Sequence, residues 1–231
     1  MKIKFFVLKK KVIVSILLLL VVACVFCATY FPIKTSTTPK LVHTIVIDAG
    51  HGGIDGGASG KKTGVSESEL NLKFAKCLEK LFNEFGFKTV LTREDMEGLY
   101  DENATSKKKS EMKNREETIK NCNPDLILSI HMNSFSSSNT RGAHIFYAKD
   151  NASGQALATS ISSSLASGIE YVHKTPKVGD YYILNCTQKP AVLIECGFLS
   201  NEQEELLLQD EEYVQKFCYY LFCGVLKFYS N

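Results

Sequence analysis

Three short apolar segments constrain the fold of this chain more than any other feature. They are TIVID at Thr44–Asp48, DLILSIH at Asp125–His131 and AVLIE at Ala191–Glu195. Runs that are apolar at almost every position are typical of strands buried on both faces. Between the first two, large apolar residues recur every three or four positions over 66–85 and Gly86 follows, which predicts an amphipathic helix. The alternation predicts an α/β three-layer sandwich, with a central mixed, mostly parallel sheet of about six strands and helices on both faces.

The first 31 residues form a segment of different composition. Five lysines precede an uncharged apolar run from Val12 to Phe31, which has roughly the 20 residues that a transmembrane helix needs. The lysine excess predicts that the N-terminus stays inside and the rest of the chain is exported. An uncleaved membrane anchor is favoured over a cleaved signal peptide, whose apolar core is usually shorter, and lipoprotein processing near Cys24 is a third alternative. Each alternative places the remaining chain outside the cytoplasm, membrane-anchored or secreted.

After residues 1–31, the sequence predicts a short linker over 32–41 and one catalytic domain over 42–231, since 231 residues suit one sizeable domain better than two. The net charge of +2 conceals an uneven distribution, because seven of the 27 basic residues lie in residues 1–40, which contain no acidic residue. The rest of the chain contains 20 basic and 25 acidic residues and is therefore net negative. A nucleic-acid-binding domain would be expected to be basic, which excludes a nucleic-acid partner. The domain cysteines lack metal or disulfide spacing, so buried thiols are the simpler interpretation and their disulfide state stays open.

Each of the three apolar segments leads into a side chain suited to metal or proton chemistry. His51 follows the first within a glycine-rich turn, His131 ends the second, and Glu195 ends the third. If the strands are parallel neighbours, these side chains meet at the carboxyl edge of the sheet, where α/β proteins bind ligands. Glu67 lies on the apolar face of the helix predicted over 66–85. A buried carboxylate needs a partner, and a metal bound by the two histidines would provide one.

Two histidines and one carboxylate with an open fourth position form a known catalytic zinc site. We therefore predict one Zn²⁺ per chain, held by His51, Glu67 and His131. Glu195, close by but not a ligand, is predicted to take a proton from water and pass it to a leaving nitrogen. The chemistry predicted from these residues is amide hydrolysis.

Other polar residues are assigned to the surroundings of the predicted site or to the scaffold. Three lie near strand or helix ends close to it and are expected to support the ligands or to contact the substrate: Arg93, Arg115 and Asn133. His43 begins a predicted strand and His144 lies within one, so both are expected to be structural and far from the catalytic edge.

Four motifs occur in order along the chain: IDAGHGGIDGGA, ESELNLKFA, SIHMNS and IECGFLSNEQE. Together they resemble the zinc-dependent N-acetylmuramoyl-L-alanine amidases of the third amidase family over residues 43–228. The resemblance implies that His51, Glu67 and His131 bind zinc and that Glu195 is the catalytic glutamate. It also implies that the substrate is peptidoglycan, cut at the amide between N-acetylmuramic acid and L-alanine.

One domain with an N-terminal anchor and no wall-binding repeat further resembles the germination-specific amidases of spore formers. This implies spore-cortex remodelling with muramic-δ-lactam formation, in the forespore intermembrane space or cortex. Ala49 and Ser68 depart from the family pattern but remove no catalytic group. Two alternatives stay open: a zinc peptidase or carboxypeptidase acting on wall peptides, and an amidase or wall-binding module active only with an accessory or lipoprotein partner.

Overall fold

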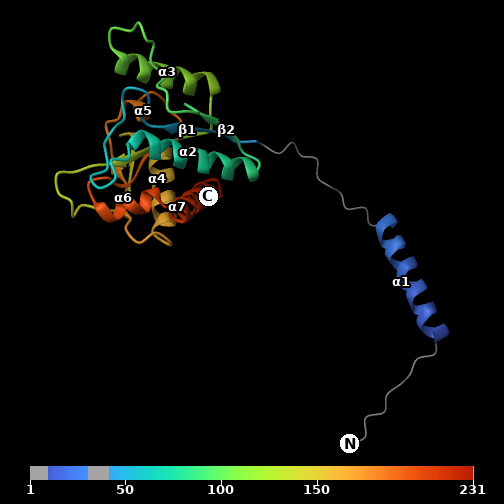
Figure 1. The fold of residues 1–231 in the computed structure, drawn as a ribbon. Helices are drawn as coiled ribbons and strands as arrows, with labels where there is room; N and C mark the ends of the chain where they lie inside the picture. The colour runs from blue at the N-terminus through green and yellow to red at the C-terminus, as the bar shows by residue number, and fades with distance from the viewer. Residues whose placement is uncertain (1–9, 31–41, 231) are drawn as a thin grey trace, which may run out of the picture. The chain divides into compact units, whose positions relative to one another are not determined.

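The structure is a computed structural model that describes residues 10–30 and 42–230, and the chain divides into two compact units, Met1–Leu41 and Val42–Asn231. Figure 1 shows the elements in chain order. They are α1 (Lys10–Tyr30), β1 (Thr44–Ala49), α2 (Glu67–Glu84), β2 (Lys88–Leu91), α3 (Lys107–Cys122), β3 (Leu126–Asn133), β4 (His144–Tyr147), α4 (Ala152–Leu165), β5 (Lys177–Val178), α5 (Tyr182–Asn185), β6 (Ala191–Phe198), α6 (Glu202–Gln209) and α7 (Glu211–Tyr229).

The first unit contains the helix α1, which has no acidic residue in its first turn. In the described part of the chain, no helix combines the length and the apolar character required to cross a bilayer. The predicted membrane-spanning segment is therefore not confirmed. Residues 1–9, Phe31 at the end of the predicted apolar run, and the predicted linker over 32–41 lie outside the described residues.

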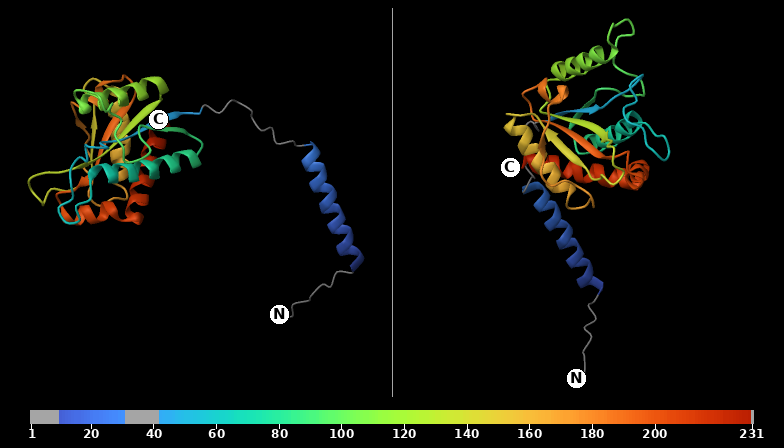
Figure 2. Two further views of the ribbon diagram at one scale, coloured as in Figure 1. Left: turned by 45° about the horizontal axis from the view of Figure 1, so that its top comes forward. Right: turned by 90° about the vertical axis from the view of Figure 1, so that its left-hand side faces the viewer.

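The second unit is built on one six-stranded sheet with the order β2-β1-β3-β6-β4-β5. The strands β2, β1, β3 and β6 run parallel to one another. β4 runs antiparallel to β6, and β5 runs parallel to β4. Helices lie on both faces of the sheet, as Figure 1 and Figure 2 show. The predicted α/β fold with a mixed, mostly parallel sheet is therefore confirmed.

The sheet separates two hydrophobic cores. α2, α4 and α7 form one layer, and α3 with α5 covers the opposite face (Figure 2). Because side chains alternate along a strand, Ile45 and Ile47 of β1 join the larger core, whereas Val46 joins the smaller core under α3. In β6 the same alternation places Leu193 in the smaller core. Glu195, two residues further along, therefore lies on the same face as α3 and α5.

α2 lies in the layer of the larger core, and its first residue, Glu67, places a carboxylate at the edge of the sheet. The helix begins after Ser66, whose hydroxyl accepts a hydrogen bond from the N–H of Glu69 at 3.3 Å. Phe74 on its inner face is fully buried in the larger core, where its ring contacts that of Phe217 in α7. The helix stops before Gly86, whose φ of 80° favours glycine. This placement leaves Glu67, its first residue, buried where the parallel strands end.

Candidate functional site

The three residues predicted to bind a metal lie together at the carboxyl edge of the parallel strands. His51 follows β1, Glu67 opens α2 and His131 lies near the end of β3. Glu67 Oε1 is 3.1 Å from His51 Nε2 and 3.0 Å from His131 Nδ1. One ligand atom from each residue lies within 4.8 Å of the others. Among the described residues, this is the group of side chains that could hold a metal ion.

The donor atoms fit zinc in type and spacing. Zinc bonds of about 2.0–2.1 Å in a tetrahedron place neighbouring donors roughly 3.3 Å apart, close to the separations of 3.0 and 3.1 Å between Glu67 and the two histidines. For His51 Nε2 to face a metal, Nδ1 must carry the ring hydrogen. Asp55 Oδ1 lies 3.0 Å from His51 Nδ1 and can accept that hydrogen. A carboxylate in this position orients the imidazole and strengthens it as a ligand.

Glu67 is held in its ionised form. Its Oε2 accepts a hydrogen bond from the Ala58 N–H at 2.9 Å, and its Oε1 accepts one from the Met132 N–H at 3.2 Å. Burial alone would raise the pKa of Glu67, but hydrogen bonds and charge interactions with His131 and His51 outweigh burial and hold the pKa well below its ordinary value. The carboxylate is therefore available to bind a cation at neutral pH.

Gly50 is required by the position of the His131 ring. A Cβ atom on Gly50 would lie 2.2 Å from His131 Cε1. We expect Gly50→Ala to bind less zinc than the natural protein, measured by elemental analysis after purification, because the methyl group would displace the ring of a candidate ligand. Gly56→Ala is a matched control in the same turn, since a Cβ there meets Ser66 Cβ at 3.8 Å, an ordinary contact. One zinc per chain in Gly50→Ala would contradict this account of the turn.

Glu195 lies directly beside the candidate metal-ligand group. It is the register partner of His131 across the parallel pair of β6 and β3. Its side chain is buried, and its Oε2 has no hydrogen-bond partner among the described residues. Burial raises the pKa of Glu195 to about 7 despite the opposing effect of His131. A carboxyl group with this pKa gains and loses a proton near neutral pH, as a general base must.

Arg93 holds the two ligand-bearing segments together through their backbone. Its guanidinium donates hydrogen bonds to the carbonyl oxygens of Ala49 at 3.0 Å and Gly50 at 3.1 Å, which precede His51. A third bond of 2.6 Å goes to the carbonyl of Ser68 in the first turn of α2. The structure therefore places Arg93 as a support of the ligands rather than in the pocket.

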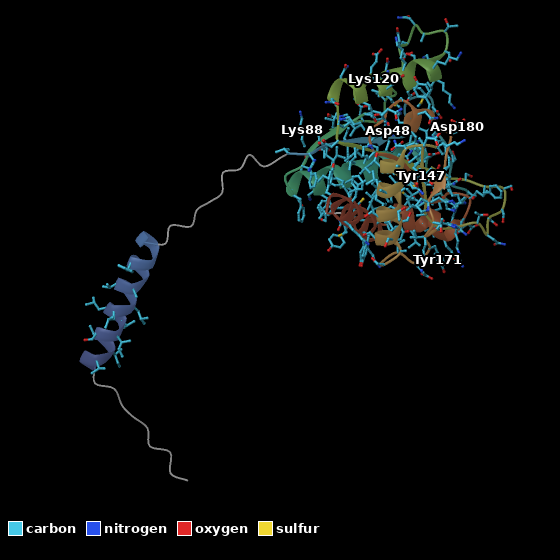
Figure 3. The ribbon with its side chains drawn as sticks, turned by 180° about the vertical axis from the view of Figure 1, so that it is seen from behind. Asp48, Lys88, Lys120, Tyr147, Tyr171 and Asp180 are labelled. Carbon is cyan, nitrogen blue, oxygen red and sulfur yellow. The ribbon has the colours of Figure 1, made fainter. Side chains whose placement is uncertain are left out.

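Arg115 forms a buried ionic network under α3. It pairs with Asp48 and with Glu111, and it also donates to the carbonyl oxygens of Ala49 and His51. Figure 3 shows Asp48 among closely packed side chains, with Lys120 of α3 at the surface. The guanidinium is already paired with both carboxylates. Arg115 lines the pocket, but its contacts show that it supports the turn around His51.

A pocket of about 390 Å³ opens over the ligand group. Of the residues expected near the site, Asn133 lines this pocket, and its Oδ1 accepts a hydrogen bond from the Ser134 N–H at 2.8 Å. The wall of the pocket opposite the strand ends is formed by α3, by α5 and by Tyr181, the residue that precedes α5. These elements contribute Lys108, Met112, Tyr181, Tyr182 and Ile183.

Some residues near the site were misplaced or missed by the sequence prediction. His144 was expected far from the catalytic edge, but β4 is antiparallel to β6 and pairs His144 with Glu195. The beginning of β4 therefore lies at the edge where the parallel strands end. Asp55 and Tyr181 were missed. Asp55 lies in a turn and Tyr181 precedes a four-residue helix, and neither position has a periodic sequence signal. The only indication for Asp55 was that a carboxylate occurs in the turn that contains His51.

Comparison with known proteins identifies the family. The model of the N-acetylmuramoyl-L-alanine amidase family Amidase_3 matches residues 45–227. The germination-specific N-acetylmuramoyl-L-alanine amidase of Bacillus subtilis is 31% identical over 202 residues, which cover 86% of this chain and 84% of that protein. Among solved structures, the CwlD amidase of Clostridioides difficile in complex with the GerS lipoprotein is 40% identical with a TM-score of 0.78. The match covers 81% of this chain and 98% of that chain.

A second solved structure, the catalytic domain of the CwlV amidase from Bacillus (Paenibacillus) polymyxa, is 29% identical with a TM-score of 0.73. It covers 82% of this chain and 99% of that chain. Peptidoglycan lies outside the cytoplasm, so the site of action is extracytoplasmic. The chain belongs to the N-acetylmuramoyl-L-alanine amidase family and is an amidase of peptidoglycan.

Proposed function

We propose that this amidase uses one zinc ion held by His51, Glu67 and His131, with Glu195 as its catalytic base and acid. The observation that supports this most is the convergence of two imidazole nitrogens on Glu67 Oε1, beside a buried glutamate without a hydrogen-bond partner among the described residues. Bound zinc supplies Lewis-acid chemistry, which activates water and polarises a carbonyl.

Glu195 is suited to move the proton in this reaction. Its carboxylate accepts a proton from the water that attacks the lactyl carbonyl of N-acetylmuramic acid. The same carboxyl then donates the proton to the nitrogen of L-alanine as the amide bond breaks. Burial raises the pKa of Glu195 above that of an exposed glutamate, which suits a group that must both accept and donate a proton.

The contacts of Arg115 favour an amidase over a carboxypeptidase. A carboxypeptidase typically binds the terminal carboxylate of its substrate through an arginine that has no other partner. Arg115 is the arginine that lines the pocket within the described residues, and Asp48 and Glu111 already occupy it.

The domain organisation and the biological setting extend this proposal. Residues 1–31 would direct export, 32–41 would form a linker, and 42–231 would carry catalysis, because the substrate is extracytoplasmic and the basic and apolar residues gather at the N-terminus. The relative from Bacillus subtilis is germination-specific, which supports a role in spore-cortex remodelling and germination. The Clostridioides difficile relative was solved with a lipoprotein, which supports a similar accessory partner here.

Metal content and product identity test the proposed function together. Elemental analysis of the purified full-length chain should find one zinc, and mass spectrometry should find stem peptides headed by free L-alanine after incubation with purified peptidoglycan. A folded chain that binds zinc but releases peptides with other N-termini would overturn the assignment. A folded chain without zinc and without product would indicate that a partner completes the site.

The rate should depend on pH through Glu195. This carboxyl must be ionised to accept a proton, so kcat/KM should fall about tenfold per pH unit below its pKa. Burial places that pKa at about 7, and a bound cation would lower it. We therefore expect an acid limb at or below about pH 7, measured with zinc-loaded enzyme between about pH 5 and 8. A kcat/KM that rises as the pH falls over this range would contradict the role of Glu195 as the base.

A further inference from the structure

A third side chain continues the row formed by the metal ligand and the catalytic glutamate. His131, Glu195 and His144 occupy adjacent strands β3, β6 and β4 and are paired in register. Paired residues project from the same face of a sheet, and neighbouring strands lie about 4.8 Å apart. His144 therefore lies one strand beyond Glu195 and roughly 10 Å from His131.

His144 belongs to a cluster of three basic side chains. Its ring centroid is 3.7 Å from that of His173, and its Nδ1 is 3.3 Å from the Nζ of Lys177. A hydrogen bond of 2.9 Å from the His173 N–H to the Ala143 carbonyl fixes the backbone beside β4. Among the described residues, no carboxylate forms an ion pair with Lys177 or His173. We call His144, His173 and Lys177 the basic cluster.

The basic cluster has an unused hydrogen-bond donor beside an exposed cation. The Lys177 ammonium donates to His144 Nδ1, which leaves the ring hydrogen on Nε2. His144 Nε2 is buried and has no partner among the described residues. Burial, together with the charges of His173 and Lys177, lowers the pKa of His144 to about 4, so the ring is neutral at pH 7. The exposed Lys177 ammonium, whose neighbour in the cluster is a neutral ring rather than a carboxylate, is a suitable receptor for a carboxylate.

We propose that the basic cluster binds a carboxylate of the acidic stem peptide and so selects the amidase substrate. This inference rests on the proposed function, because it assumes that the scissile carbonyl lies over His51, Glu67 and His131. In a stem peptide whose second residue is glutamate linked through its side chain, the free α-carboxylate lies about 7 Å from the scissile carbonyl. Strand spacing puts the backbone of His144 about 4.8 Å beyond that of Glu195, so a group with this reach can extend from a carbonyl beside Glu195 towards the basic cluster.

Two muropeptides that differ in one group test the proposal. One carries the free α-carboxylate on the second stem residue, and the other carries a carboxamide at the same atom. The zinc-loaded full-length enzyme should prefer the free acid by about fivefold in kcat/KM, the effect of one partly exposed charged hydrogen bond. Lys177→Gln should remove most of this preference by raising KM for the acid, with kcat nearly unchanged. Lys177→Arg, which keeps the charge, should restore it.

The control is Lys174→Gln, an exposed lysine of the same segment with the same change in net charge. It should keep the preference of the natural enzyme, and zinc content should be equal in all variants. An identical acid-to-amide ratio in Lys177→Gln and the natural enzyme would overturn the proposal, as would a natural enzyme that does not distinguish the two substrates. Failure to cleave either muropeptide with zinc bound would instead contradict the proposed function itself.

Discussion

Glu195→Gln should lower kcat by about a thousandfold while leaving one zinc per chain. Glutamine has nearly the shape of glutamate but cannot accept the proton of the attacking water, and general-base catalysis typically contributes 10²–10⁴-fold. Zinc should remain because Glu195 lies beside the ligand group without belonging to it. Single-turnover release of stem peptide and elemental analysis measure the two effects separately.

The matched control is Glu212→Gln, the same chemical change at an exposed position of α7. It should have the activity and zinc content of the natural protein. His131→Ala provides the complementary pattern, since it removes a proposed ligand and should lose zinc and activity together. Near-normal turnover in Glu195→Gln would show that another group is the base.

Arg115→Met should destabilise the fold by about 3–5 kcal/mol, because it leaves buried charges without their partner. Both Asp48 and Glu111 are buried and pair with Arg115. The carbonyl of His51 also loses a donor, so zinc affinity should fall as well. The free energy of unfolding from urea titration measures the first effect, and competition with a zinc chelator measures the second.

The pH dependence of this loss follows from Asp48. Burial would raise the pKa of Asp48, but Arg115 and the hydroxyl of Ser129 hold it below its ordinary value of 3.8. In the natural protein the ionised form thus adds stability above pH 3.8, which is lost as pH falls through the lower folded-state pKa. Without Arg115, burial dominates and favours the protonated acid, so the gap between variant and natural protein should narrow as pH falls from neutral.

Lys113→Met is the control for this substitution. Lys113 lies on the same helix, its side chain is 72% exposed, and it pairs with Glu117 at 3.5 Å. A surface pair of this kind contributes about 0–1 kcal/mol. Equal destabilisation by Arg115→Met and Lys113→Met would mean that the ionic network under α3 is not what stabilises this region.

The local pattern of the sequence was sufficient to predict the candidate metal-ligand group, because the direction of the strands decides where their last residues lie. Parallel strands end at the same edge, so any polar residue that follows such a strand approaches the others. His51, His131 and Glu195 all follow this rule. Glu67 was predicted from the apolar face of its own helix, because a buried carboxylate at the start of that face requires a partner. These inferences depend only on strand and helix periodicity.

The direction of β4 could not be predicted in this way. The alternation of buried and exposed residues in a four-residue strand does not show whether it pairs parallel or antiparallel. Contacts with β6, rather than the residues of β4 alone, decide the pairing. The antiparallel pairing brought His144 to the catalytic edge. A parallel β4 would have placed the same residue at the opposite end of the sheet. The proposed carboxylate subsite therefore has no signature in the sequence.

The sequence by itself determined the α/β class, the strands that end in chemical groups, and the candidate ligands with their neighbouring glutamate. Arg93, Arg115 and Asn133 were also expected near the site, but only the tertiary structure decided which groups they contact and which further side chains lie beside them. Asp55 reaches His51 through a turn, and Arg93 and Arg115 bind backbone carbonyls far from them along the chain. Periodicity encodes which face of an element is buried, whereas contacts between distant segments depend on how all the elements pack together.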